Sequence, residues 1–222
     1  MNAKYDQVRS LIFSPSREAN LYLYHVVFLM LLVAYPIAVE DLNLPVFAFT
    51  VMMVVYILFT LLLPEKLNYG ILAVGIVAVI YVLLNSENLY DEPSFLVKSA
   101  LLFLFTFLTF INMMREILKS DISLRLIFLC IDGYLFLGMC FSFLFRIMHY
   151  LDSNAFNFPI NQEFNHIYMS FVVFTSTGLG DLLPTAMASK ALVMLNGLCG
   201  QIYLAFFAAM IVGKYLSKTI NS

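Results

Sequence analysis

Thr175-Ser176-Thr177-Gly178-Leu179-Gly180-Asp181 lies late in the chain, between a short amphipathic segment and a long apolar one. Successive backbone carbonyls can point the same way only if the backbone alternates between right-handed and left-handed conformations. Glycine adopts the left-handed ones without steric penalty. Gly178 and Gly180 therefore allow the carbonyls of residues 176–179 to face one axis, with the Ser176 hydroxyl at the inner end. Rings of such oxygens can replace the hydration shell of a cation.

This stretch resembles the potassium-channel signature Thr-Thr-Val-Gly-Tyr-Gly-Asp, and Leu182-Leu183-Pro184-Thr185 continues as that family often does. The segment from Gly197 to Gly213 is similar to the inner helix of bacterial channels, with Gly200 at the position of the gating-hinge glycine. The resemblance covers roughly residues 163–216. It implies an ion-conducting filter made of Thr175, Ser176, Thr177, Gly178, Leu179, Gly180 and Asp181. It also implies that potassium binds at Ser176, Thr177, Gly178 and Leu179. Potassium is the permeant ion and the sole expected ligand.

The composition is that of an integral membrane protein, because 62% of the 222 residues are hydrophobic and only 12% are charged. The net charge of -2, with no basic cluster among aromatics, excludes nucleic acid as a partner. No nucleophile, base and metal-binding group cluster at a usable spacing, so we expect no enzyme activity and no cofactor. Cys130, Cys140 and Cys199 lie in apolar segments and are expected to be buried free thiols.

Apolar runs predict an all-α membrane protein with six transmembrane helices, and the resemblance adds a re-entrant pore helix and a selectivity filter, in a voltage-gated-channel-like architecture. The expected spans are Leu21–Val39, Leu44–Leu63, Tyr69–Leu84, Phe95–Met114, Leu124–Met148 and residues 187–216. The expected parts are a cytoplasmic amino-terminal segment (1–19), a four-helix voltage-sensor-like domain (20–114), a cytoplasmic linker helix (115–123) and a pore domain (124–222) with its pore helix at 163–175, its filter at 175–181 and its inner helix at 187–216.

The fourth span argues against strong voltage sensing. In voltage-gated relatives this span carries an arginine at every third residue, but here its only basic residues are Lys98 near the outer end and Arg115 at the inner end. Moving one charge across the membrane is worth about 2.3 kcal/mol per 100 mV, and steep gating needs several such charges. We therefore expect little intrinsic voltage sensing.

The distribution of basic residues predicts the orientation. If the amino terminus is inside, only Lys98, Arg146 and Lys190 of the 12 lysines and arginines lie outside. This distribution agrees with the positive-inside rule. Both termini are then cytoplasmic and Asp181 faces outward. We expect a multi-pass protein of the cell membrane, and specifically a bacterial inner membrane because the inner helix resembles that of bacterial channels.

The filter requires several copies of the chain, since no second Gly-x-Gly-Asp or other internal repeat is present. The resemblance implies a homotetramer in the lipid bilayer. The alternative function is a transporter or a non-conducting accessory subunit with a filter-like loop. A transporter normally shows paired inverted repeats, and the sequence has none.

Four positions depart from the family pattern. Leu179 replaces the usual tyrosine or phenylalanine, which removes a hydroxyl that can brace the filter, and Thr177 replaces valine or isoleucine. Tyr168 and Met169 occupy positions where tryptophan is frequent. We therefore expect a less rigidly held filter that conducts potassium with weaker selectivity than is typical, or that inactivates readily.

Candidates for gating are Gly197 and Gly200 in the last span and Asp132 in the fifth. The glycines can act as hinges or can allow close helix packing. An ionisable group at the depth of Asp132 is costly, so this acid is either bonded at a helix contact or coupled to gating. His149 and His166 are expected to be solvated. Unless the native chain is longer than this one, we expect no nucleotide- or calcium-binding domain at either terminus, and we expect regulation through the spans, lipid, pH, tension or a partner protein.

Overall fold

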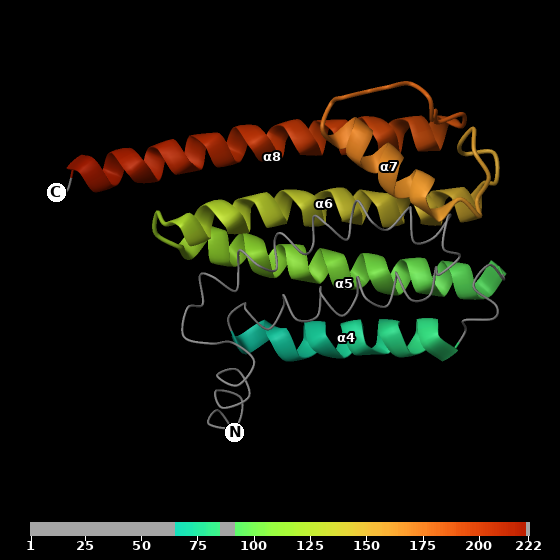
Figure 1. Cartoon of the computed structure of the whole chain (residues 1–222), viewed down its shortest axis with the longest axis horizontal. Helices are drawn as coiled ribbons and strands as arrows, with labels where there is room; N and C mark the ends of the chain where they lie inside the picture. Colours follow the sequence, from blue (N-terminus) through green and yellow to red (C-terminus); the bar gives the residue numbers. More distant parts are fainter. Residues whose placement is uncertain (1–64, 85–91, 221–222) are drawn as a thin grey trace.

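The computed structural model describes residues 65–84 and 92–220, which form helices joined by loops (Figure 1). The helices are α4 (Glu65–Leu84), α5 (Glu92–Lys119), α6 (Leu124–Leu151), α7 (Glu163–Phe174) and α8 (Met187–Ile220). The predicted amino-terminal segment and the first two predicted spans lie outside the described residues.

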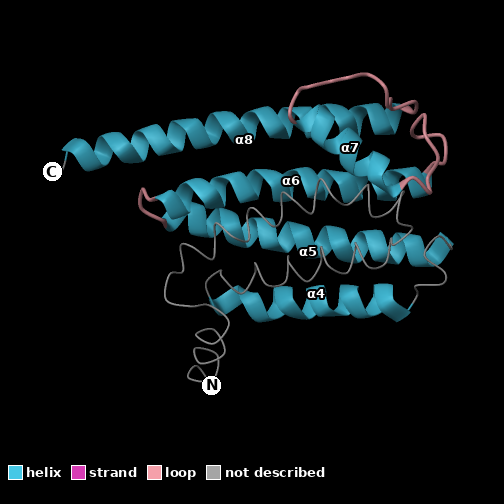
Figure 2. Cartoon of the chain, in the orientation of Figure 1, coloured by secondary structure: helices cyan, strands magenta, loops and turns pink. Residues whose placement is uncertain are grey.

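The short helix α7 is held between two long helices. α4 packs on α5, α5 packs on α6, and α7 contacts both α6 and α8 (Figure 1). The loops before and after α7 lie at one end of the bundle, and the second of them, residues 175–186, arches over α8 (Figure 2). This second loop contains the stretch that resembles a filter.

Within the described residues, three helical segments are long and apolar enough to cross a membrane: Ser94–Lys119, Leu126–Leu151 and Met187–Ser217. At about 1.5 Å of rise per residue, each exceeds the ~30 Å hydrocarbon core. The apolar stretches of α4 and α7, Gly70–Tyr81 and Phe164–Phe174, are shorter. The described part of the chain is therefore all-helical with three candidate spans, and a total of six spans remains a prediction.

The boundary between α5 and α6 differs from the expected linker helix over 115–123. α5 continues without a break through Arg115 to Lys119, and a short turn of residues 120–123 follows. The Ser120 hydroxyl donates to the carbonyl of Glu116 at the end of α5. The Ser123 hydroxyl accepts from the Leu126 amide and caps α6. The charged residues thus extend α5 instead of forming a separate helix.

The main core lies between α5 and α6, and side chains from α4, α7 and α8 pack onto it. Its buried side chains include Phe105 and Met113 of α5, Met139 of α6 and Phe207 of α8. Arg146, predicted on the outer side of the membrane, is buried within α6, and its guanidinium carbon lies 4.7 Å from the centroid of the Phe95 ring. This cation–π contact ties α5 to α6.

The three cysteines are free thiols, as predicted. Cys130 and Cys140 are buried, whereas Cys199 on α8 is only partly buried.

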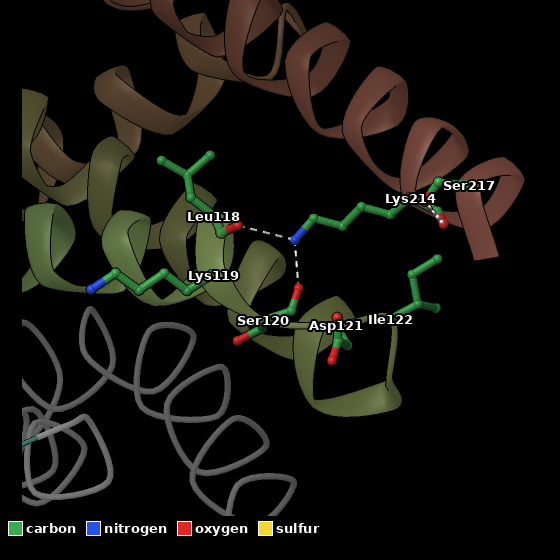
Figure 3. A pocket seen from close by; sticks show the side chains of 7 residues that line it. All are labelled: Leu118, Lys119, Ser120, Asp121, Ile122, Lys214 and Ser217. Atoms are coloured by element: carbon green, nitrogen blue, oxygen red, sulfur yellow. Dashed lines mark hydrogen bonds between the residues drawn. The ribbon is translucent and has the colours of Figure 1, made fainter. Parts of the chain in front are cut away.

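Lys214, near the end of α8, connects this helix to the turn between α5 and α6 (Figure 3). Its Nζ donates to the carbonyls of Ile117 at 3.1 Å and Leu118 at 3.3 Å, and to that of Ser120. These acceptors lie at the carboxyl end of α5, where carbonyls lack helical partners and the helix dipole is negative. Lys214 also borders a cavity of about 490 Å³ between the end of α8 and the turn that joins α5 to α6.

Lys214→Met is expected to lower the free energy of unfolding by about 2 kcal/mol, because three hydrogen bonds from a charged donor are lost. Thermal unfolding followed by circular dichroism in detergent measures the change. Lys119→Met is the matched control, since Lys119 is exposed, lines the same cavity and points away from Lys214 in Figure 3. A change within about 0.5 kcal/mol is expected for this control. Equal losses in the two variants would contradict a specific role for the Lys214 contacts.

Candidate functional site

The loop after α7 begins by bonding back to the last turn of that helix. Thr175 follows the last helical residue, and the amides of residues 176–178 donate to the carbonyls of Val172 and Val173 at 2.9–3.1 Å. These bonds use helix-terminal carbonyls that would otherwise lack partners. They fix the start of the loop at the negative end of the α7 dipole, which favours a nearby cation.

The backbone alternates in handedness along this loop. Ser176, Gly178 and Gly180 have φ of 59°, 58° and 80°, and the residues between them do not have positive φ. Both glycines thus have the left-handed conformation that their spacing predicts. Ser176 extends the alternation one residue inward, although serine rarely adopts this conformation. All seven residues of 175–181 are exposed to solvent in the single chain.

α8 reaches the inner end of the loop through Gly200 and the residue after it. A Cβ added at Gly200 would lie 2.3 Å from the carbonyl oxygen of Phe174, so only glycine allows this approach. Gln201 then donates from Nε2 to the Ser176 hydroxyl at 2.6 Å. Tyr134 of α6 donates to the same Phe174 carbonyl at 3.2 Å. The geometry therefore supports close packing as the reason for glycine at position 200.

Gly197 has more space. A Cβ there would meet Val173 Cγ1 at 3.6 Å, an ordinary van der Waals distance. Its position on α8 favours neither the hinge nor the packing interpretation.

The outer end of the loop is held by the segment before α7. Asn157 donates from Nδ2 to the Asp181 carbonyl at 3.3 Å and accepts from the Leu183 amide at 2.8 Å. Tyr168 of α7 forms a side-chain hydrogen bond with Asp181, and this contact raises the pKa of Tyr168 above its usual value. Asp181 is therefore connected to α7 as well as to the segment before that helix.

His149 and His166 are buried and paired, not solvated as expected from the sequence. Nδ1 of His149 lies 2.9 Å from Nε2 of His166, which joins the end of α6 to the first turns of α7. The rings of Phe156 and Phe158 pack edge-on against both imidazoles. The two histidines are shielded from solvent because Phe156 and Phe158, in the loop between α6 and α7, cover both imidazole rings.

Asp132 is buried within α6 and lies at the contact between α6 and α8. Its neighbour Gly133 faces Tyr203 of α8 so closely that a Cβ would lie 2.3 Å from the phenol oxygen. Tyr203 in turn donates to the Cys130 carbonyl at 2.8 Å. The position favours the interpretation of Asp132 as a helix-contact acid.

Within residues 65–84 and 92–220, no group of three or more histidine, cysteine, aspartate or glutamate side chains could hold a metal ion.

Comparison with known families agrees with the geometry. Residues 129–217, which include α7, the loop after it and most of α6 and α8, match a family model described as "Ion channel". The match covers fewer than half of the residues of the chain. Searches of curated proteins and of solved structures gave no match. By this match, residues 129–217 form a region similar to the ion channel family.

Proposed function

We propose that this protein is a subunit of a potassium channel that conducts passively, without enzymatic chemistry or a cofactor. The observation that carries the proposal is the alternating backbone of Ser176, Gly178 and Gly180 at the carboxyl end of α7. Alternation of this kind lets successive carbonyls face one axis, and rings of carbonyls select potassium in known filters. Residues 175–181 are the proposed filter, with potassium at residues 176–179.

The proposed assembly is a homotetramer in the plane of a cell membrane, with both termini cytoplasmic. One face of α8 supports contact with other copies or with lipid, because Met194, Leu198 and Ile202 recur every four residues and are all more than half exposed. The opposite face, with Tyr203 and Phe207, is buried against the chain's own helices. Such an apolar exposed stripe near a filter suits a closed ring of subunits.

Potassium flux in proteoliposomes tests the proposal. A potassium gradient is expected to drive flux that external barium blocks, since barium has a similar size and binds more strongly to rings of oxygen ligands. Liposomes without protein are the control. Failure to conduct under either membrane polarity, low pH and membrane tension would contradict the channel function. A reversal potential in mixed potassium and sodium tests the weaker selectivity, which is refuted if sodium permeability is not measurable.

A further inference from the structure

The side chains of Thr175 and Thr177 form a hydrogen-bonded chain that ends on α7. The Thr175 hydroxyl donates to the Phe171 carbonyl at 2.7 Å, and the two threonine hydroxyl oxygens are 2.9 Å apart. A hydroxyl has a single proton to donate. Since the Thr175 proton is directed to Phe171, the hydroxyl of Thr177 must be the donor between the two threonines.

Thr177 is therefore attached to α7 twice. Its amide donates to the Val172 carbonyl at 3.0 Å, and its hydroxyl reaches Phe171 through Thr175. The residue lies between two left-handed residues, where a rotation of one peptide plane would turn a carbonyl away from the axis. Two attachments on one residue restrict such a rotation.

Leu179 cannot provide an equivalent attachment. Its side chain has no polar atom and is 64% exposed in the chain. The resemblance to potassium channels led us to expect a weakly braced filter because an aromatic hydroxyl is missing at this position. The hydroxyl of Thr177, two residues earlier in the loop, provides an attachment to α7 instead.

We propose that Thr177 is a positioning residue that sets the ion selectivity of this filter through the hydroxyl chain to Thr175 and Phe171. The inference rests on the proposed potassium conduction. Selectivity depends on the number and position of the oxygen ligands around the ion. Without the hydroxyl chain, the carbonyls of the filter can move to the shorter distances that sodium requires.

The test measures the permeability ratio of potassium to sodium from reversal potentials of the full-length protein in bilayers. Thr177→Val, which keeps the shape and removes the hydroxyl, is expected to lower the ratio at least about fivefold, the factor that corresponds to one neutral hydrogen bond, because one such bond is lost in each of the proposed subunits. Thr177→Ser keeps the hydroxyl and is expected to restore most of the lost ratio. The reversal potential does not depend on how many channels fold, so a lower yield of protein cannot imitate the effect.

A double-mutant cycle of Thr177→Val with Thr175→Val tests whether the two hydroxyls act together, as members of one hydrogen-bonded chain, or independently. Because the two threonines belong to one hydrogen-bonded chain, the double variant is expected to match the worse single variant. Additive losses, or an unchanged ratio in Thr177→Val, would overturn the inference while leaving potassium conduction intact. A native protein that passes no potassium would instead overturn the proposed function, and this inference with it.

Discussion

Gly200→Ala is expected to lower the free energy of unfolding by about 3 kcal/mol, the upper part of the range for overpacked sites. The new Cβ would lie 2.3 Å from the carbonyl oxygen of Phe174 and 3.1 Å from its carbon. Both contacts are to backbone, so no side-chain rotation can relieve them. α8 would have to move away from α7, which would also separate Gln201 from the Ser176 hydroxyl. Thermal unfolding in detergent and potassium flux are both expected to decrease.

Gly213→Ala is the matched control on the same helix. A Cβ at Gly213 meets no atom within 4 Å, so the substitution adds no clash. Alanine favours a helix over glycine by about 1 kcal/mol, and a small gain in stability is therefore expected. If Gly200→Ala folds as stably as the native protein and alters only gating, the hinge interpretation is supported and the close packing of α7 on α8 is contradicted.

The helices around the site could be predicted from the sequence because their apolar runs and their breaks are strong local features. The predicted pore helix at 163–175 corresponds to α7, and the predicted fifth span corresponds to α6 with three further residues at its end. The linker helix was the exception. The charged residues after Met114 predict a separate cytoplasmic linker helix, but charges can also extend a helix beyond the apolar core. The capping by Ser123 sets the actual boundary.

The conformation of the site could be predicted only at positions where the residue type itself indicates the backbone conformation. Glycine indicates the left-handed backbone at positions 178 and 180, but serine gives no such indication at 176. The left-handed Ser176 is accompanied by a hydrogen bond from Gln201, 25 residues away in the chain. The pairing of His149 with His166 likewise depends on how α6 packs against α7. Contacts between distant residues of this kind leave no pattern in a single sequence.

Gly178→Ala is expected to lower potassium flux at least about 100-fold without preventing folding. Gly178 has φ of 58°, and a left-handed conformation costs an L-residue about 1–2 kcal/mol. In the proposed tetramer the cost arises four times around one axis, so about 4–8 kcal/mol would oppose the conducting arrangement of carbonyls. No atom lies within 4 Å of the added Cβ in the chain, so the folded chain itself can accept the methyl group. Proteoliposome flux and thermal unfolding of the same preparation measure the two effects.

Gly70→Ala is the control for this substitution, because Gly70 also has open space around it but lies in α4 with a helical backbone. It is expected to leave potassium flux unchanged. Gly180→Ala, with φ of 80° in the native chain, is expected to reduce flux as Gly178→Ala does. Loss of flux at both filter glycines with normal unfolding temperatures would assign the effect to backbone handedness. Full conduction by Gly178→Ala would mean that the left-handed backbone at this position is not needed for ion passage. The alternating backbone of residues 176–180 would then no longer support the proposed function.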